Sequence, residues 1–482
     1  MAIARKLAYN VIFNSVLKVT STVVLSLFLV RLITGYLGQE GFGKYATVLA
    51  FFSFFAAISD LGLGTVTARE ISKEGSNEKK IIGSVVSLRL ISSALIITIA
   101  PVVVYFFQYP IEVKWGIIVV ACASLFSSLS LVLNGIFQKR IAMDRVAMVE
   151  FVGKLIQVGL IASIVRFDLG FLPIVVSVLV ALAFNVVTVF IISRRFIHFS
   201  LHIDIPFWKH FLKESLPMGA TAIITFAYFK TDTILLSLMR PSAEVGIYNV
   251  AYKIIENLIF FPAMLSGLIL PLLARYFLSH RKKFTDIANK TFKVFVIIVL
   301  PVVLGTVFLA PHIVRIISGP EFDASAPVLR ILAFSLCFIF FGHYFSMILI
   351  VGNIQKKLMH ALLFVAAFNI SLNLFLISQY FYIGAAVAAV LTEGLVVLFT
   401  ATLAYRVLSF SPRFSGIGGV LFSAFGMGLT LFSLQSFPFI VTGLVSVMVY
   451  VGLLWFTRSV SSDEIISLFS KENEELVEGP IV

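Results

Sequence analysis

Apolar stretches of about 20 residues alternate with short polar segments along the whole chain, and about 20 apolar residues let an α-helix cross the roughly 30 Å hydrocarbon core of a bilayer. The pattern therefore predicts an all-α, multi-pass membrane protein with about fourteen transmembrane helices. The predicted spans are 11–34, 44–64, 81–106, 115–137, 147–166, 171–193, 217–239, 246–272, 291–311, 327–350, 358–380, 383–405, 415–435 and 437–457. The joints at 380–383 and 435–437 are so short that either pair of spans can also be read as one long helix.

The positions of lysine and arginine test this count independently, because these residues concentrate in short cytoplasmic loops. With the N-terminus inside, 24 of the 37 basic residues fall in inside segments and 5 fall in outside loops or at their edges. A missed or invented span would reverse every later loop and destroy this bias. We therefore predict a protein of the plasma or inner cell membrane with both termini in the cytoplasm.

Composition agrees with this interpretation. Hydrophobic residues make up 60% of the chain, charged residues make up 13%, and the mean hydropathy is +1.04. Soluble domains are about 45–50% apolar and about 25% charged, so this chain has too little polar surface to coat a water-soluble globule. The inside loops account for the net charge of +13, which therefore does not indicate a nucleic-acid partner. Cys122 and Cys337 both lie in apolar runs, so no disulfide framework is predicted.

A short junction occurs twice. Gly-x-Tyr stands at 43–45 and again at 246–248, each time after a polar break and before a long apolar run. Ala-Arg follows at 68–69 and 274–275, at a similar offset. Six predicted spans separate the copies, and this even number gives both halves the same orientation. Glycine and tyrosine are also frequent at membrane interfaces in general, which is the alternative explanation. We interpret the pattern as a parallel repeat of six plus six helices, an architecture of transporters with the substrate site between the halves.

The repeat predicts the domain organisation. A helix with apolar and basic positions, residues 204–216, is expected to lie at the membrane interface between the lobes and to end before Pro217. The predicted segments are an N-terminal lobe at 1–195, an amphipathic linker at 196–216, a C-terminal lobe at 217–406, two further spans at 407–460 and a cytoplasmic tail at 461–482.

Eight basic residues fall inside predicted spans, where ionised side chains are costly and by default face a bundle interior or a watery cavity. Five of them lie near span ends, from which they can reach the membrane surface, or stand one turn from an acid on the same helix. Lys18, Arg89 and Lys230 have neither explanation. They predict a cavity that accepts an anionic head group, with ion pairing between the lobes as the alternative.

The candidate site residues follow from these charges. The candidates for substrate binding are Lys18, Arg31, Arg89, Lys230, Lys253, Asn369 and Asn373. The two asparagines lie one turn apart and could equally hold helices together by hydrogen bonds. The carboxylates Asp60, Asp232 and Glu393 have no basic residue one turn away, so they are candidates for exchanging a proton or a sodium ion during transport and, in the alternative, for pairing with the interior cations.

No catalytic constellation competes with transport. The chain has no HExxH zinc motif and no phosphate-binding P-loop, and GLGTVT at 62–67 lacks the third glycine of a dinucleotide fingerprint. We therefore predict no enzyme activity, no catalytic residue, no bound metal and no cofactor.

Several segments together resemble polysaccharide flippases of the O-antigen type, in the multidrug/oligosaccharidyl-lipid/polysaccharide exporter superfamily. They are LGQEGFGKYA (37–46), DLGLGTVTAREIS (60–72), LPMGATAIITFAYFKTDTILL (216–236), VGIYNVAYKI (245–254) and NISLNLFLISQYFYIGAAVAAVLTE (369–393). The resemblance covers about residues 1–405 and implies two six-helix lobes that work by alternating access. It implies that the partner is an oligosaccharide on a polyprenyl phosphate or pyrophosphate carrier, moved from the cytoplasmic to the outer leaflet for cell-surface polysaccharide. Many such flippases have twelve spans, and the lipid II flippase suggests a lipid-tail groove at the two extra spans.

Two other functions are weighed against this one. Multidrug cation exporters of the same superfamily use an acidic residue in the first span, whereas this first span carries Lys18 and Arg31 and no carboxylate. A membrane polysaccharide polymerase or ligase usually needs a sizeable outer loop, whereas the longest one predicted here is 312–326. We expect a monomeric flippase whose partners are its lipid-linked cargo and membrane lipids.

Overall fold

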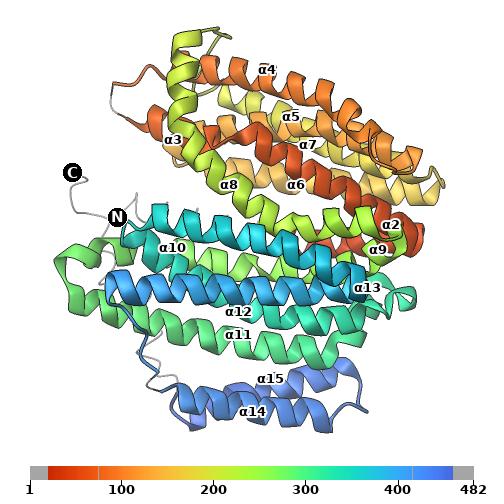
Figure 1. Cartoon of the computed structure of the whole chain (residues 1–482), viewed down its shortest axis with the longest axis vertical. Coiled ribbons are helices and arrows are strands. Elements are labelled where there is room, and N and C mark those ends of the chain that lie inside the picture. The colour runs from red at the N-terminus through yellow and green to blue at the C-terminus, as the bar shows by residue number, and fades with distance from the viewer. Residues whose placement is uncertain (1–19, 74, 415, 460–482) are drawn as a thin grey trace. The chain divides into compact units, whose positions relative to one another are not determined.

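The computed structural model describes residues 20–73, 75–414 and 416–459, which form helices and short connections with no strand among them. The all-α prediction is confirmed. The helices are α2 (Leu25–Asp60), α3 (Leu63–Ser72), α4 (Glu78–Tyr105), α5 (Ile111–Lys139), α6 (Met143–Arg166), α7 (Phe171–Ser193), α8 (Ile205–Met239), α9 (Ser242–Leu258), α10 (Phe260–Ser279), α11 (Arg281–Ser318), α12 (Ser325–Val351), α13 (Gln355–Leu408), α14 (Ile417–Ser433) and α15 (Phe439–Phe456), with a π-helix at Thr20–Val24 and a 3-10 helix at Pro320–Phe322 (Figure 1).

The helices agree with the predicted spans. Among the described residues, ten helical segments are long and apolar enough to cross a membrane, by length and composition. Two of the ten correspond to two predicted spans each: α2 covers residues 25–34 and 44–60 of the first two spans, and α13 contains 358–380 and 383–405. The remaining two predicted spans correspond to α8 and to α14, which is shorter at 17 residues. Residues 11–19 of the first predicted span lie outside the described residues. The chain is therefore a multi-pass membrane protein.

Two predicted joints between spans each contain a single non-helical residue. The polar break at 35–43 is helical within α2, apart from Gly38 with φ 64° and ψ −169°. Glycine has no Cβ and adopts positive φ without steric cost, so one residue suffices to redirect the chain. The joint at 380–383 is similarly reduced to Phe381, with φ 57° and ψ −139°, inside α13. Short joints of this kind look like continuous apolar sequence, which is why 380–383 could be read as one long helix.

The chain divides into two compact units. The first contains the described residues of Met1–Asn249 together with Ile317–Glu321 and Asn373–Tyr382, and the second contains Val250–Ile316, Phe322–Leu372 and the described residues of Ile383–Val482. This division by packing falls after Asn249 in α9, whereas the repeat places the lobe boundary at 196–216. Packing does not test a division by repeat, so the predicted lobes stay a prediction.

The core of the first unit includes the beginning of α8. Phe211 is 2% exposed and joins Val85 of α4 and Phe137 of α5 in one buried cluster. The Trp208 indole N–H donates to the Ser84 carbonyl at 2.9 Å, and the Asp204 carboxylate caps the helix by accepting the Phe207 N–H at 3.0 Å. The helix predicted for 204–216 is therefore present, but it packs on protein and continues through Pro217 as one helix to Met239.

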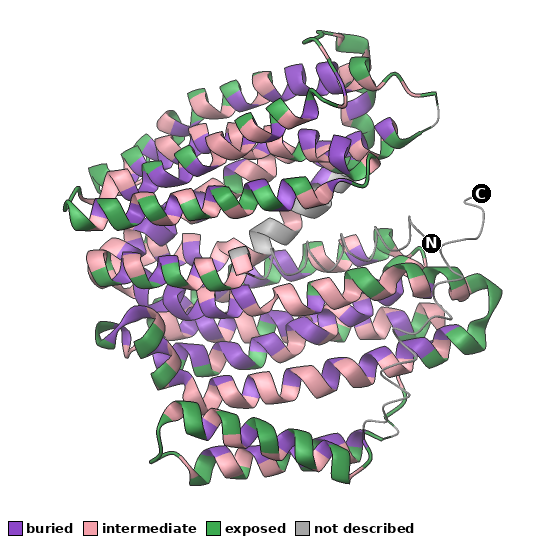
Figure 2. Cartoon of the chain, turned by 180° about the vertical axis from the view of Figure 1, so that it is seen from behind, coloured by how far each residue is buried: buried purple, intermediate pink, exposed green. Residues whose placement is uncertain are grey.

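In the second unit, the α14–α15 hairpin attaches through one stripe of α15. Its buried residues are Thr442, Ser446, Tyr450 and Leu454, each one helical turn after the last. The Tyr450 hydroxyl donates to the Ile297 carbonyl of α11 at 2.8 Å. Figure 2 shows that most of the remaining hairpin surface is exposed or half-buried, as expected for helices that face lipid. This bond ties α15 to α11.

Candidate functional site

The two copies of the repeated junction meet in the first unit. A Cβ added to Gly43 would overlap the Ser242 carbonyl oxygen and lie 2.9 Å from the Gly246 nitrogen. A Cβ added to Gly246 would overlap the Gln39 carbonyl oxygen and lie 3.2 Å from the Gly43 nitrogen. Both glycines are therefore required for a backbone-to-backbone contact between α2 and α9. The residues that match in sequence also touch in space.

The second copy of the repeated junction, at 246–248, places Tyr248 next to a predicted site residue. Asp232, on α8, is 3% exposed. Its two carboxylate oxygens accept the Tyr248 hydroxyl at 3.0 Å and the Asn373 side-chain N–H at 2.7 Å. Alongside, Thr233 donates to Asn249 at 3.0 Å. We call Asp232, Tyr248 and Asn373 the Asp232 cluster. All three belong to the first unit, although α8, α9 and α13 supply them from distant parts of the sequence.

The Asp232 cluster contains two residues that the sequence selects and one that it does not. Asp232 was predicted for ion coupling and Asn373 for substrate binding, and the structure joins them. Tyr248 was noted as part of the repeat, yet no spacing rule links it to Asp232 because a helix break separates α8 from α9. Asn369, one turn before Asn373, donates to Thr392 at 3.0 Å within the second unit, and Glu393 is 6% exposed there.

A second buried charge, Arg89 on α4, pairs with Asp60. The closest nitrogen–oxygen distance between them is 2.5 Å, and a second guanidinium N–H of Arg89 donates to the Ser59 carbonyl at 3.2 Å. The same Asp60 oxygen, Oδ1, also accepts the Gly64 N–H at 3.1 Å. These contacts bridge the break between α2 and α3, where Leu61 and Gly62 have positive φ. Asp60 and Arg89, selected for different roles, thus pair with each other within the predicted N-terminal lobe, and this pair is not one between the lobes.

The other predicted cations lie in varied surroundings. Arg31 is exposed, and its guanidinium lies close to Gly319, where an added Cβ would be 2.8 Å away. Lys230 is half-buried on α8. Lys253 pairs with Glu256 on α9 at 2.8 Å, as its i,i+3 spacing predicted. Lys18 lies outside the described residues. The roles of these residues in substrate binding stay a prediction.

Comparison with known proteins identifies the family. A family model described as "Polysaccharide biosynthesis protein" matches residues 7–277, and the MatE family model matches residues 217–375. Among curated proteins, the uncharacterized membrane protein MJ1068 of Methanocaldococcus jannaschii is 27% identical over 164 residues, or 33% of this chain. Because those residues are 32% of that protein, the chain spans about a third of the length of the curated relative it matches.

Solved structures share the fold. The lipid II flippase MurJ in an inward closed conformation matches with a TM-score of 0.74 and 17% identity, over 93% of this chain and 99% of that one. An inward-facing multidrug resistance MATE transporter of the MOP superfamily matches with a TM-score of 0.63 and 16% identity, over 83% and 99%. A MOP superfamily transporter from Pyrococcus furiosus, described as having a binding pocket of reversed polarity, matches with a TM-score of 0.54 and 15% identity, over 84% and 96%. These structures share the fold that the resemblance predicts.

Proposed function

Because the chain belongs to the polysaccharide biosynthesis protein family, we propose that it moves an oligosaccharide linked to a lipid phosphate or pyrophosphate from the cytoplasmic to the outer leaflet. The observation that carries this proposal is the family match over residues 7–277, more than half of the chain. The cargo would serve cell-surface polysaccharide biosynthesis. The protein would act as a monomer in the cell membrane, with both termini in the cytoplasm, as the distribution of basic residues predicts.

The contact of the repeated glycines supports alternating access. Equivalent residues that touch one another lie next to the symmetry axis that relates their copies. Gly43 and Gly246 touch, which is the arrangement expected of two parallel repeats around an axis along the membrane normal. We propose that this contact closes the outer side in one state of the cycle and separates in the other.

The charges inside the spans support an anionic cargo. A phosphate that enters a low-dielectric cavity needs compensating cations, because desolvating an unpaired ion costs several kcal/mol. Lys230 is half-buried on α8, two residues before Asp232. Arg89 contributes a second buried guanidinium, which is paired with Asp60 in this structure. In this proposal, Lys230 and Arg89 both receive the phosphate, and the bond of Arg89 to Asp60 opens when the phosphate binds.

The Asp232 cluster supports ion coupling. Two neutral donors hold the Asp232 carboxylate in position, and a buried carboxylate is the kind of group whose charge a proton or a sodium ion can compensate. We propose that Asp232 or Glu393 exchanges such an ion during the transport cycle. Transport that persists unchanged in both Asp232→Asn and Glu393→Gln would exclude the two residues as coupling sites.

A multidrug cation exporter is the second candidate function. The match of the MatE model to residues 217–375 favours it, because this region carries the buried Asp232. The absence of a carboxylate from predicted span 11–34 argues against it, because that family uses an acid there to handle cations. The charge of the substrate therefore separates the two functions.

Transport by charge variants in liposomes tests the proposal. Lys230→Ala is expected to lose translocation of a fluorescent lipid-pyrophosphate oligosaccharide while the protein still inserts and folds. Lys230→Arg should keep part of the activity, because it keeps the charge. Lys290→Ala, which removes a surface cation paired with Asp286, is the matched control and should transport normally.

Double variants distinguish an anion site from a structural ion pair. If Arg89 only holds helices together, Arg89→Ala loses transport because Asp60 is left unpaired. Asp60→Asn in the same chain should then restore transport. Rescue of Arg89→Ala by Asp60→Asn, and of Lys230→Ala by Asp232→Asn, would contradict the role of these cations in receiving the cargo.

A further inference from the structure

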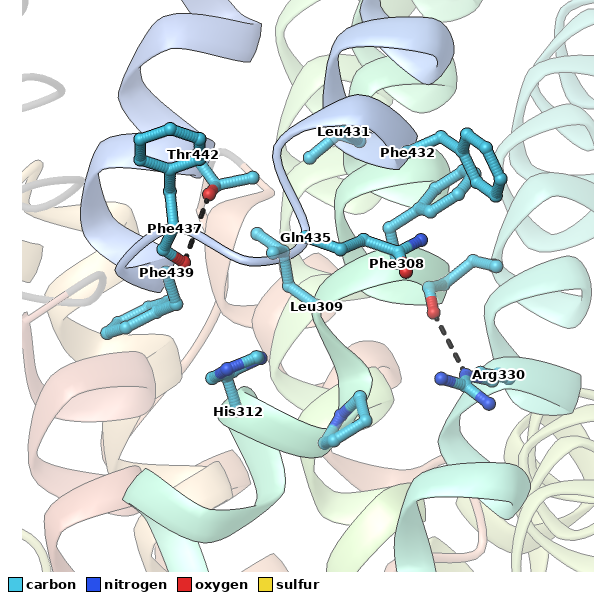
Figure 3. A pocket seen from close by; sticks show the side chains of 12 residues that line it. Phe308, Leu309, His312, Arg330, Leu431, Phe432, Gln435, Phe437, Phe439 and Thr442 are labelled. Carbon is cyan, nitrogen blue, oxygen red and sulfur yellow. Dashed lines mark hydrogen bonds between the residues drawn. The ribbon is translucent and has the colours of Figure 1, made fainter.

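A hollow of about 460 Å³ lies in the second unit, where the ends of α11 and α12 meet the α14–α15 hairpin (Figure 3). This volume falls within the roughly 300–1,000 Å³ of small-molecule sites. Its lining combines aromatic rings with four polar side chains, His312, Arg330, Gln435 and Thr442, and contains no carboxylate. None of these residues was selected as a site from the sequence.

Local hydrogen bonds fix the wall of this pocket. The Thr442 hydroxyl donates to the Leu434 carbonyl at 2.9 Å, which closes the turn between α14 and α15. That turn carries Gln435 and Phe437 to the pocket. On the other side, the His312 ring of α11 stacks on Phe439 of α15, with 5.9 Å between ring centroids and 12° between planes. The pocket is therefore built by packed helices and a tied turn.

The charge of the lining favours an anion. Arg330 is exposed, and its Nε donates to the Val307 carbonyl at 3.1 Å, which leaves its terminal nitrogens to other partners. Within the described part of the chain, no carboxylate pairs with Arg330. Gln435 adds an amide and His312 an imidazole, both able to donate hydrogen bonds. A phosphate oxygen fits such a set of donors, because charge-assisted bonds to arginine are strong.

The position of the pocket favours an amphiphilic ligand. Arg330 stands in the second turn of α12, about 8 Å from the beginning of that helix at 1.5 Å per residue. Phe334, one turn further along the same face, is 54% exposed, and Phe432 on the α14 side is 65% exposed. Both are surfaces for lipid chains. The distribution of basic residues predicts that this end of the helices faces the outer leaflet.

We propose that this pocket binds the phosphate group of an anionic lipid in the leaflet at that end, with Arg330 and Gln435 as donors and the exposed aromatic rings against the lipid chains. The bound anion then compensates the charge of Arg330 near the outer end of α12. This inference does not depend on the proposed cargo, because a resident phospholipid and a polyprenyl phosphate present the same group.

Native mass spectrometry of the full-length protein tests the inference. The protein is incubated with equal amounts of phosphatidylglycerol, phosphatidylcholine and polyprenyl phosphate, and the retained lipid is measured. Arg330→Gln should lower retention of the anionic lipids about tenfold, the effect of losing one charge-assisted hydrogen bond. Gln435→Leu should lower it less. Arg315→Gln is the matched control, because Arg315 is bound to Asp323 at 2.8 and 2.6 Å outside the pocket, and it should retain lipid like the wild type.

The other possible results of this experiment also either support or overturn the inference. Preference for phosphatidylglycerol or for polyprenyl phosphate supports the site and identifies the source of the phosphate. If Arg330→Gln and Arg315→Gln lose equal amounts of anionic lipid, retention depends on general surface charge, and the inference is overturned. Phosphatidylcholine retained as well as the anionic lipids, or full displacement of lipid by inorganic phosphate, would also overturn it. If Arg330→Gln does not fold, Gln435→Leu alone carries the test.

Discussion

Tyr248 is the residue at which the repeated junction and the Asp232 cluster meet. Its hydroxyl donates to Asp232 at 3.0 Å, whereas its counterpart Tyr45, which is buried at 7% exposed, donates no hydrogen bond within the described residues. The two copies have therefore diverged in chemistry while keeping the same glycine contact. Sequence could predict the repeat and the buried acid, but not their connection, which depends on how α9 turns back along α8.

Replacing Tyr248 by phenylalanine tests this difference. A hydrogen bond to a charged group contributes about 1.5–3 kcal/mol, so Tyr248→Phe should lower the free energy of unfolding by that order. It should also impair coupled transport, because Asp232 loses one of its positioning donors. Tyr45→Phe is the matched control and should change neither quantity. Thermal unfolding in detergent and transport in liposomes measure both, and equal effects of the two variants would contradict the assignment.

Gly43 is the second residue whose role can be tested by substitution, because its missing Cβ allows the close contact with Ser242. Alanine here places a methyl group on the Ser242 carbonyl, and overpacking of this kind costs about 1–3 kcal/mol. Gly35 lies on the same helix with open space around its missing Cβ, so Gly35→Ala should be neutral or stabilise the helix by up to about 1 kcal/mol. Opposite shifts in melting temperature are expected. A Gly43→Ala protein as stable as the wild type would refute the close contact.

Among the helices, α8 was predicted only in part from the sequence: its beginning was predicted, but not its packing partner or its end. The apolar and basic pattern of 204–216 correctly indicates a helix, and Asp204 is a typical N-terminal cap. The same pattern cannot distinguish an apolar face that meets lipid from one that meets α4. Pro217 suggested an end, yet the helix continues beyond it. Tertiary packing decided both points.

Trp208 anchors this part of α8, and its replacement tests the packing. Trp208→Phe removes the bond to the Ser84 carbonyl and should cost about 0.5–1.5 kcal/mol of stability. Trp455, which is 81% exposed at the end of α15, provides the control, since Trp455→Phe should have no measurable effect. If the two variants unfold alike, the beginning of α8 does not pack on α4 as described.

The single-residue joints show why helix boundaries were harder to predict than the number of spans. Gly38 and Phe381 each redirect a helix with a single residue, so no polar loop marks the place. Span counting nevertheless succeeded, because it relied on apolar length and basic residues rather than on loop length. Exact boundaries depend on single dihedral angles that hydropathy does not report.

For the whole molecule, the first property to measure is the membrane topology, that is, on which side of the bilayer each loop lies. In a Cys122→Ala, Cys337→Ala background, Ser279→Cys should react with an impermeant thiol reagent only from the cytoplasm. Glu112→Cys and Glu321→Cys should react only from outside. The reason is the excess of basic residues in the predicted inside loops. Labelling from the opposite side at any of these positions would refute the fourteen-span topology.

Translocation by the purified wild-type protein tests whether its substrate is a lipid-linked oligosaccharide. Liposomes containing the protein receive either a fluorescent lipid-pyrophosphate oligosaccharide or a fluorescent lipophilic cation, and movement across the bilayer is followed for each. For a flippase of this kind, we expect the lipid-linked oligosaccharide to change leaflets faster than in protein-free liposomes and the cation not to cross faster. Accelerated export of the cation without movement of the oligosaccharide would contradict the proposed function and favour a multidrug cation exporter.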